Sequence, residues 1–250
     1  MVYSLYLTFG VGLPQRLVVF PLVSLLPSRR RAILGAWLHF HARATVGIAR
    51  VVGNIRVNIR GSIPAGSCIA VMNHQSILDI PLALSLVHDP LTLIPYRDRY
   101  HRFIPGVSPL LRATGMPRVT QGAGRRERGI AARDLKEIEG AADRTARGEC
   151  SMVIFPEGHR TRTGEIGPFM RRGLTTILRR AKRPVYCLVV DGLWQARTAA
   201  EAARTVAGSS VNVSVLGPIE PPEDDQIDQF IASLREKMSA ALHQMRSERS

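Results

Sequence analysis

Short apolar runs alternate with longer stretches of helical periodicity after residue 61. The apolar runs, which we expect to be strands, cover residues 67–72, 91–95, 116–120, 151–155, 185–190 and 211–216. Between residues 128 and 147 the apolar positions recur at steps of three and four, which predicts a helix that ends at Gly148. The prolines and acids that begin at Pro221 predict the start of a last helix, which runs to about Met245. This alternation predicts an α/β fold with a mostly parallel sheet covered by helices.

The N-terminal part of the chain has a different pattern. Residues 2–26 are apolar, but Pro14, Arg16 and Pro21 interrupt them, so no unbroken apolar run has the length expected of a helix that crosses a bilayer. Residues 32–52 are apolar with interspersed His and Arg, which suits a helix that lies at the headgroup boundary of a membrane. The alternatives are an ordinary helix packed on the domain and a single span by residues 2–26.

The chain is strongly basic, with 34 Lys and Arg against 20 Asp and Glu and a formal charge of +14. None of the first 78 residues is acidic, and eight arginines there contribute +8. This charge predicts an anionic partner, and an acid-free apolar segment suits a phospholipid surface. Nucleic acid is not expected, because zinc-finger spacing and aromatic-rich motifs are absent from the sequence. We therefore divide the chain into a membrane-associating helical segment, residues 1–60, and an α/β domain, residues 61–250.

Three cysteines, Cys68, Cys150 and Cys187, lie inside or beside apolar runs without CxxC spacing. Buried free thiols are expected, in preference to a disulfide, a zinc site or a catalytic thiol. A secretory signal peptide is not expected, because no basic region precedes the first apolar stretch and a Ser-Arg-Arg-Arg run follows it. These features predict a protein at a membrane surface, with the cytoplasmic face of the inner membrane as the expected location.

The first candidate for chemistry is Asn-His-Gln-Ser-Ile-Leu-Asp, residues 73–79, directly after an apolar run. Open α/β sheets place ligands at the C-terminal ends of strands, so His74 is expected to be exposed there. If a helix begins near Ser76, Asp79 can orient the imidazole, and the other ring nitrogen can take a proton from a hydroxyl. By itself, such a pair is more often a structural hydrogen bond. Ser76 is expected to cap the helix and not to act as a nucleophile, because no Gly-x-Ser-x-Gly elbow is present.

The second candidate is Phe-Pro-Glu-Gly-His-Arg, residues 155–160, which also follows an apolar run. Its glycine permits a tight turn that would present Glu157 and Arg160 at the same sheet edge as His74. The planar fork of Arg160 suits a phosphate, and Glu157 could accept a hydrogen bond from a substrate hydroxyl. A surface salt bridge at a turn is the alternative for this segment alone.

Together, the NHxxxxD and FPEGxR segments resemble the motifs of the glycerolipid acyltransferase family, typified by 1-acylglycerol-3-phosphate acyltransferases. The resemblance extends from about residue 56 to residue 219. It implies that His74 is the general base on an acceptor hydroxyl and that Asp79 orients it. It also implies that Glu157, Gly158 and Arg160 bind the acceptor.

Two segments depart from the pattern of that family. Gln121 stands where an arginine that contacts phosphate is expected, which leaves Arg118 or Arg125 as substitutes. His159 replaces the usual Ser or Thr of the FPEG segment. A later Pro-Val pair before a strand is kept at residues 184–185. These departures affect the identity of the acceptor more than the type of reaction.

The resemblance therefore implies direct transfer of a fatty acyl group from acyl-CoA or acyl-carrier protein to the hydroxyl of a lysophospholipid, with 1-acylglycerol-3-phosphate as the expected acceptor and phosphatidate as the product. Neither a metal nor another cofactor is expected, because a thioester is already activated. Backbone N–H groups near Ser76, or in the turn at Glu157 and Gly158, are candidate donors to the oxyanion. The alternatives are transfer to another lysolipid, such as an aminoacyl lipid, and a noncatalytic lipid-binding protein.

Overall fold

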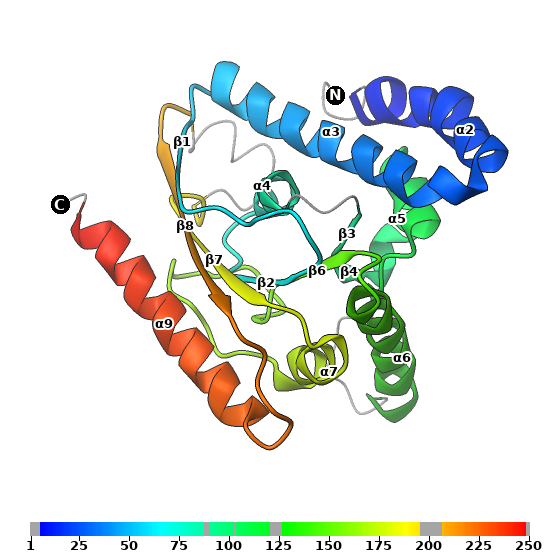
Figure 1. Cartoon of the computed structure of the whole chain (residues 1–250). Coiled ribbons are helices and arrows are strands. Elements are labelled where there is room, and N and C mark those ends of the chain that lie inside the picture. The colour runs from blue at the N-terminus through cyan, green and yellow to red at the C-terminus, as the bar shows by residue number, and fades with distance from the viewer. Residues whose placement is uncertain (1–5, 88–90, 103, 121–126, 196–206, 249–250) are drawn as a thin grey trace.

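A twisted six-stranded sheet forms the centre of the protein in a computed structural model, which describes residues 6–87, 91–102, 104–120, 127–195 and 207–248 (Figure 1). The strands are β1 (Arg56–Arg60), β2 (Ile69–Met72), β3 (Thr92–Leu93), β6 (Ser151–Ile154), β7 (Val185–Asp191) and β8 (Ser210–Ile219), in the order β1-β8-β7-β2-β6-β3. Neighbouring strands are parallel except β7 and β8. The predicted α/β class and mostly parallel sheet are therefore confirmed.

The central strands of the sheet are buried. Every residue of β2, β6 and β7 is buried, which explains why these strands read as continuous apolar runs in the sequence. By contrast, β1 is an edge strand with four exposed positions, and the sequence analysis did not predict it. β1 lies on the N-terminal side of the expected division at residue 60, so that part of the segment contributes a strand to the sheet. The division itself stays a prediction.

Helices cover both faces of the sheet (Figure 1). On one side lie α3 (Arg30–Val51) and α4 (Asp79–Leu86), which pack on each other. On the other side lie α6 (Glu127–Ala146), α7 (Arg171–Ala181) and α9 (Ile227–Ser247). The expected helix over residues 128–147 is α6. The last helix begins at Ile227, after the turn that follows the two prolines, and not at Pro221.

A small second sheet carries β4 (Tyr96–Arg97) and β5 (Arg118–Val119), which are parallel and are linked through α5 (Val107–Thr114). The run at residues 116–120 was expected to be a strand of the main sheet, but it pairs with β4 instead. The run at residues 91–95 contributes only the two residues of β3 to the main sheet. Two-residue strands carry too little periodicity for a sequence pattern to predict their partners.

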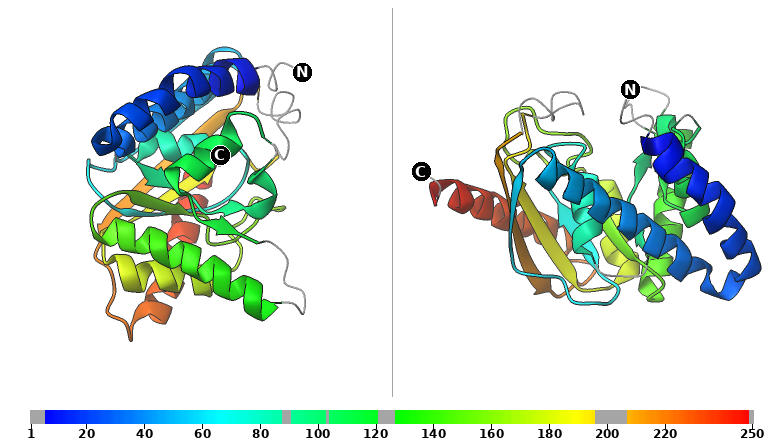
Figure 2. Two further views of the ribbon diagram at one scale, coloured as in Figure 1. Left: turned by 90° about the vertical axis from the view of Figure 1, so that its right-hand side faces the viewer. Right: turned by 90° about the horizontal axis from the view of Figure 1, so that it is seen from above.

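The N-terminal arm, residues 6–51, consists of two helical limbs. The first limb comprises π-helical turns at Tyr6–Gly12 and Gln15–Val19, followed by α2 (Phe20–Leu25), and the second limb is mainly α3. In the described part of the chain, no single helix has both the length and the apolar character to cross a membrane. The limbs Gly10–Leu25 and Pro27–Val51 pass such a test only as a pair, with a bend of 111° between them. Figure 2 shows the first limb at the periphery of the molecule, beside α3.

Candidate active site

The site lies where β2, β6 and β7 end. Asn73, the residue after β2, donates from Nδ2 to the Val190 carbonyl at 2.9 Å and accepts from the Val190 N–H at 2.7 Å through Oδ1. Since Asn73 is 2% exposed, these two bonds fix the start of the loop to strand β7 in a dry environment. The next residue, His74, is therefore held at the C-terminal edge of the sheet, as the sequence predicted.

His74 and Asp79 form a direct pair. The Nδ1 atom of His74 lies 2.8 Å from Oδ2 of Asp79, whose side chain is fully buried, while 15% of the His74 side chain is exposed. The imidazole also stacks on the Phe155 ring, with centroids 4.3 Å apart. With Nδ1–H donated to the carboxylate, Nε2 carries the lone pair that can accept a proton. The pairing inferred from the sequence is thus present.

The same Asp79 oxygen organises the turn between β2 and α4. It accepts the backbone N–H groups of Gln75 at 2.5 Å and Ser76 at 2.7 Å. The helix begins at Asp79, three residues after Ser76. Ser76 Oγ accepts the Leu78 N–H at 3.4 Å just before the helix, as a capping side chain does, while Asp79 accepts the Gln75 and Ser76 N–H groups from inside the helix. Burial raises the pKa of Asp79, and the bonds from His74, Ser76 and Gln75 oppose this rise.

Glu157 links the two motifs from behind the site. Its carboxylate accepts the His74 N–H at 2.9 Å and the Gly167 N–H at 2.9 Å, and the residue is 1% exposed. Burial raises its pKa, and the two N–H bonds oppose the change. A substrate hydroxyl cannot reach this carboxylate, so the expectation that Glu157 accepts such a hydrogen bond disagrees with the structure. The carboxylate instead holds the backbone of His74 against the loop after β6.

A cationic group faces the exposed side of that loop. Gly158 is exposed, and its carbonyl accepts a bond from Nη2 of Arg97 at 3.4 Å. Burial and the guanidinium groups of Arg99 and Arg160 lower the pKa of Arg97. Arg160 is held near the first motif, because the next residue, Thr161, donates its N–H to the His74 carbonyl at 2.8 Å. The sequence analysis identified Gly158 and Arg160 but missed Arg97. Its one signal was its position just after an apolar run, and in a chain with 31 arginines that signal has little weight.

The other candidates for a phosphate contact are not brought to this place. Arg118 pairs with Tyr96 in the small sheet, whereas Arg97 pairs with Val119, so the two arginines project from opposite faces of the ribbon. Arg118 Nε forms an ion pair with Asp98 at 3.2 Å. The structure therefore gives Arg118 a structural partner away from Gly158. Arg125 lies outside the described residues.

Two of the expected oxyanion donors are already engaged. The Ser76 N–H is bound to Asp79, and the Gly158 N–H donates to the Phe155 carbonyl at 3.0 Å. The role of the other N–H groups of these two turns stays a prediction.

Helix α9 binds the loop that follows the second motif. Arg246 donates to the Gly164 carbonyl at 2.9 Å, forms an ion pair with Asp191 at 3.2 Å and binds the carboxylate of Glu165. Asp191 in turn accepts a bond from Nε2 of Gln75 at 3.4 Å, which connects α9 to the first motif. We call this set the α9 clamp: Gln75, Asp191, Glu165, Gly164 and Arg246. Nothing in the local sequence indicated it, because its members are far apart along the chain.

The remaining nucleophilic side chains lie in the core. All three cysteines are free and buried, as expected, and burial raises the pKa of Cys187 to about 12. Among the described residues, no group of three or more His, Cys, Asp and Glu side chains could hold a metal ion.

A family described as Acyltransferase matches residues 54–191, more than half of the chain. The chain belongs to the acyltransferase family. The matched region contains both motifs and the small sheet, whereas helix α9 and its clamp residue Arg246 lie beyond it.

Two similar proteins were found in further comparisons. The 1-acyl-sn-glycerol-3-phosphate acyltransferase of Pseudomonas aeruginosa is 28% identical over 149 residues, which are 58% of this chain and 52% of that protein. The match thus spans about half the length of this curated relative. The crystal structure of the 1-acyl-sn-glycerophosphate acyltransferase of Thermotoga maritima superposes with a TM-score of 0.73 at 20% identity, over 98% of this chain and 92% of that one. The second likeness shows a shared fold.

Proposed function

We propose that the protein transfers a fatty acyl group from acyl-CoA or acyl-carrier protein to the free hydroxyl of a lysophospholipid, with 1-acylglycerol-3-phosphate as acceptor and phosphatidate as product. The observation that carries the proposal is the His74–Asp79 pair beside the cationic group of Arg97 and Arg160. A general base and a phosphate site side by side suit an acceptor that carries both a hydroxyl and a phosphate. The names of the two similar proteins support this choice of acceptor.

The acyl group passes directly from the thioester to the acceptor hydroxyl, without a covalent acyl-enzyme. Nε2 of His74 takes the hydroxyl proton while the acceptor oxygen forms a bond to the thioester carbonyl carbon. The tetrahedral intermediate then loses its C–S bond, and the departing thiolate receives the proton from His74. Asp79 keeps the Nδ1–H bond throughout and stabilises the imidazolium that forms in between. An activated thioester needs no metal or other cofactor for this reaction, so none is proposed.

The proposal places the protein on a membrane through its arm. Apolar side chains of the arm face outward, among them Leu17 at 67% exposed and Leu25 at 76%. Burial of such side chains in the headgroup boundary, together with arginines on anionic phosphates, is the usual basis for binding without a membrane span. We propose the cytoplasmic face of the inner membrane as the location, because the acyl donors are cytoplasmic and the three thiols are free.

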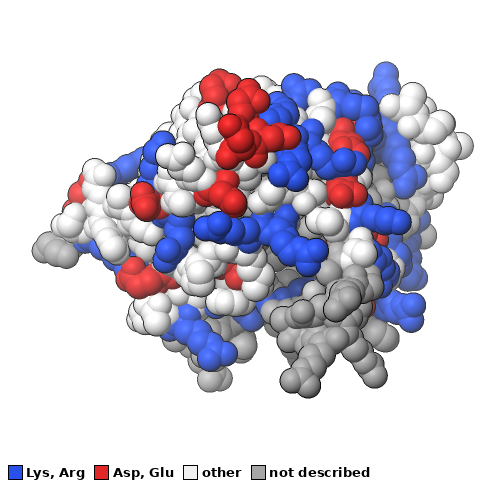
Figure 3. Space-filling view, turned by 90° about the horizontal axis from the view of Figure 1, so that it is seen from below, with Lys and Arg blue, Asp and Glu red and all other residues white. Residues whose placement is uncertain are grey.

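On the opposite face of the molecule, basic and acidic side chains are interleaved (Figure 3). Arg180 pairs with Asp143 at 3.0 Å, and Lys182 pairs with Asp224 at 2.9 Å. Arg171, at the start of α7, pairs with Asp228 at 3.3 Å. Much of the positive charge on this face is therefore locally balanced, which favours the arm side for contact with anionic lipid.

The test is turnover by purified full-length protein in detergent, followed as thiol release from palmitoyl-CoA with lysophosphatidate. His74→Ala is expected to lose about 10²–10⁴-fold in kcat, because the general base is removed. The matched control is His41→Ala, which removes an imidazole that bonds Tyr6 within the arm, and it is expected to retain activity in detergent. Equal rates for wild type and His74→Ala would contradict the proposal.

The acceptor is tested separately with a panel of lysolipids at a fixed donor. Arg97→Gln is expected to raise KM for lysophosphatidate and to leave acceptors without a terminal phosphate unchanged. Activity of the wild type toward an aminoacyl lipid, with none toward lysophosphatidate, would replace the proposed acceptor. Lipid binding without turnover on any acceptor would indicate the noncatalytic alternative.

A further inference from the structure

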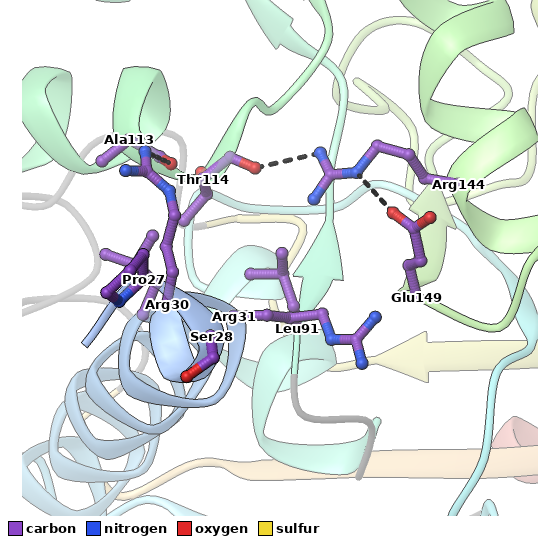
Figure 4. Close-up of a pocket in the computed structure, with 10 residues that line it drawn as sticks. Pro27, Ser28, Arg30, Arg31, Leu91, Ala113, Thr114, Arg144 and Glu149 are labelled. Carbon is purple, nitrogen blue, oxygen red and sulfur yellow. Dashed lines mark hydrogen bonds and ion pairs between the residues drawn. The ribbon is translucent and has the colours of Figure 1, made fainter. Parts of the chain in front are cut away.

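A second cationic pocket lies at the bend of the arm, away from His74. Its volume is about 390 Å³, within the range of small-ligand sites. The lining comes from the bend and the start of α3, the end of α5, and the segments that precede β3 and β6: Pro27, Ser28, Arg30, Arg31, Leu34, Leu91, Ala113, Thr114, Arg144 and Glu149 (Figure 4). Parts of the chain that are distant in sequence thus form one cavity.

Three arginines line this pocket. Arg30 donates to the Ala113 carbonyl at 2.8 Å, and Arg144 donates to the Thr114 carbonyl at 3.1 Å. Both arginines are therefore anchored on the last turn of α5, with further N–H groups left for a ligand. Arg31, by contrast, has no hydrogen-bond or ion-pair partner among the residues that the structure describes, although its charge acts on Glu149.

The charges of the lining are unbalanced. Three arginines and one carboxylate, Glu149, line the pocket, so the net formal charge of the lining is +2. Glu149 is already engaged by Arg147, which lies outside the pocket, at 2.5 Å, and it lies 3.7 Å from Arg144. Bringing like charges together is unfavourable unless an anion lies between them. A phosphate, with oxygens that accept several bonds, fits this arrangement.

The surroundings indicate a lipid and not a soluble anion. Leu25 and Leu26, 76% and 42% exposed, directly precede the Pro27 wall of the pocket. An anionic phospholipid has a phosphate for the arginines and acyl chains for these leucines. Inorganic phosphate or a nucleotide would leave the leucines in water, which is unfavourable for large apolar groups.

The pocket is not the catalytic site. Leu91 and Glu149 precede β3 and β6, whereas His74 and Glu157 follow β2 and β6. Because these strands are parallel, the pocket lies at the opposite end of the sheet from the catalytic pair. A phosphate in this pocket therefore cannot belong to an acceptor whose hydroxyl reaches Nε2 of His74 across the length of the strands.

We propose that this pocket binds the phosphate of an anionic membrane phospholipid and so fixes the orientation of the protein on the bilayer. The inference rests on the proposed function, since it takes the arm to be at a membrane surface. In this role the arm supplies apolar contact, and the pocket supplies recognition of the headgroup. Arg31 is the principal contact, because its guanidinium has no competing partner in the described chain.

The experiment compares two neighbouring arginines by co-sedimentation with phosphatidylcholine vesicles, with and without added phosphatidylglycerol. Arg29 and Arg31 carry the same charge in the same turn of chain, but only Arg31 lines the pocket. Arg29→Gln is expected to weaken binding to the anionic vesicles about fivefold, the effect of one surface charge. Arg31→Gln is expected to weaken it by about tenfold more, because charge-assisted hydrogen bonds are also lost. Arg31→Lys, which keeps the charge, is expected to recover part of the difference.

Equal losses of vesicle binding in Arg29→Gln and Arg31→Gln would contradict phosphate binding in the pocket and would indicate general electrostatic attraction to the vesicle surface. Displacement of the protein from anionic vesicles by millimolar inorganic phosphate, in the wild type but not in Arg31→Gln, would identify a soluble anion as the occupant and would also overturn the proposal. Turnover in detergent separates this proposal from the proposed function: Arg31→Gln is expected to keep the wild-type rate there. Thermal unfolding confirms that each variant is folded.

Discussion

Gly158 combines two constraints at a single residue of the site. Its φ of +67° lies in the left-handed region, and a Cβ there would lie 2.5 Å from Sδ of Met170. Gly158→Ala is therefore expected to lower the free energy of unfolding by about 1–2 kcal/mol and to raise KM for the acceptor, because the turn beside Arg97 shifts. Chemical denaturation and acceptor kinetics measure the two effects.

Gly140 provides the matched control. It lies inside α6, and a Cβ at this position meets nothing within 4 Å. Gly140→Ala is expected to raise the free energy of unfolding by about 0.8–1 kcal/mol, since alanine loses less entropy in a helix. A stabilising effect of Gly158→Ala similar to that of Gly140→Ala would show that the turn does not need its left-handed backbone.

The residue scale also shows what the sequence could and could not predict. The His74–Asp79 pair was predictable, because five residues of local chain connect the partners and the preceding apolar run placed them at a sheet edge. The position of Glu157 was not, because its two bonds go to the backbone of His74 and Gly167, and backbone partners leave no mark on the sequence. A glutamate that holds a loop and a glutamate that binds a substrate look the same in a sequence, so the sequence does not distinguish the two roles.

At the scale of elements, the α9 clamp joins a helix beyond the matched family region to both motifs. Arg246→Ala would remove one ion pair of the buried Asp191 and release Gly164 and Glu165. We expect a loss of roughly 2–3 kcal/mol in the free energy of unfolding and a fall in kcat larger than the change in donor KM, because the loop behind His74 loosens. Arg246→Lys should recover only part of the activity, since an ammonium cannot bind three partners in one plane.

An exposed arginine near the same end of α9 is the control for this prediction. Arg60 pairs with Glu248 at the surface, with 68% of its side chain exposed. Arg60→Ala is expected to change stability by no more than about 1 kcal/mol and to leave kcat unchanged. If Arg246→Ala lost stability but kept wild-type kcat and the same pH profile, the clamp would be structural only.

The stability that Glu165 contributes through the clamp depends on pH, and the direction follows from its pKa shift. The bonds from His243 and Arg246 lower the pKa of Glu165. A carboxylate with a lowered pKa contributes stability above its ordinary pKa of about 4.3, and this contribution is lost as the pH falls through the lower, folded-state value. The contribution of Glu165 to the clamp is therefore present at neutral pH and is lost in acid.

The buried strands and the edge strand differ in how far the sequence reveals them. Strands β2, β6 and β7 were predictable because burial on both faces requires continuous apolar residues. Strand β1, Arg-Val-Asn-Ile-Arg, alternates polar and apolar residues as a strand does, but its five residues lie before the change of pattern at residue 61, in the segment that was expected to be helical, so it was missed. The antiparallel pairing of β7 with β8 was also hidden, because strand direction depends on a connection and not on the residues of the strand.

For the molecule as a whole, the proposed function assigns contact with a membrane to the arm. The double variant Leu17→Gln, Leu25→Gln removes two apolar side chains that are mostly exposed to solvent. Its unfolding in solution is expected to match that of the wild type, whereas vesicle binding should weaken about tenfold or more, because each leucine gives up about 1.5–3 kcal/mol of burial. Co-sedimentation with vesicles measures the change.

The control for this prediction is Ile59→Gln, which removes an apolar side chain that is 43% exposed on β1, away from the arm. It is expected to leave vesicle binding unchanged. Equal binding by all three proteins would show that the outward leucines do not enter a bilayer.

The pairing of β1 with β8 has a consequence for the order of events during synthesis. Arg56 pairs with Ser210, so 154 residues must still be made after Arg56 before its partner exists. At about 5–20 residues per second this interval is on the order of 10–30 s. The arm, which ends at Val51, thus emerges well before the sheet edge beside it can close. With the arm at a membrane, as proposed, a nascent chain reaches the lipid surface first and completes its α/β domain there.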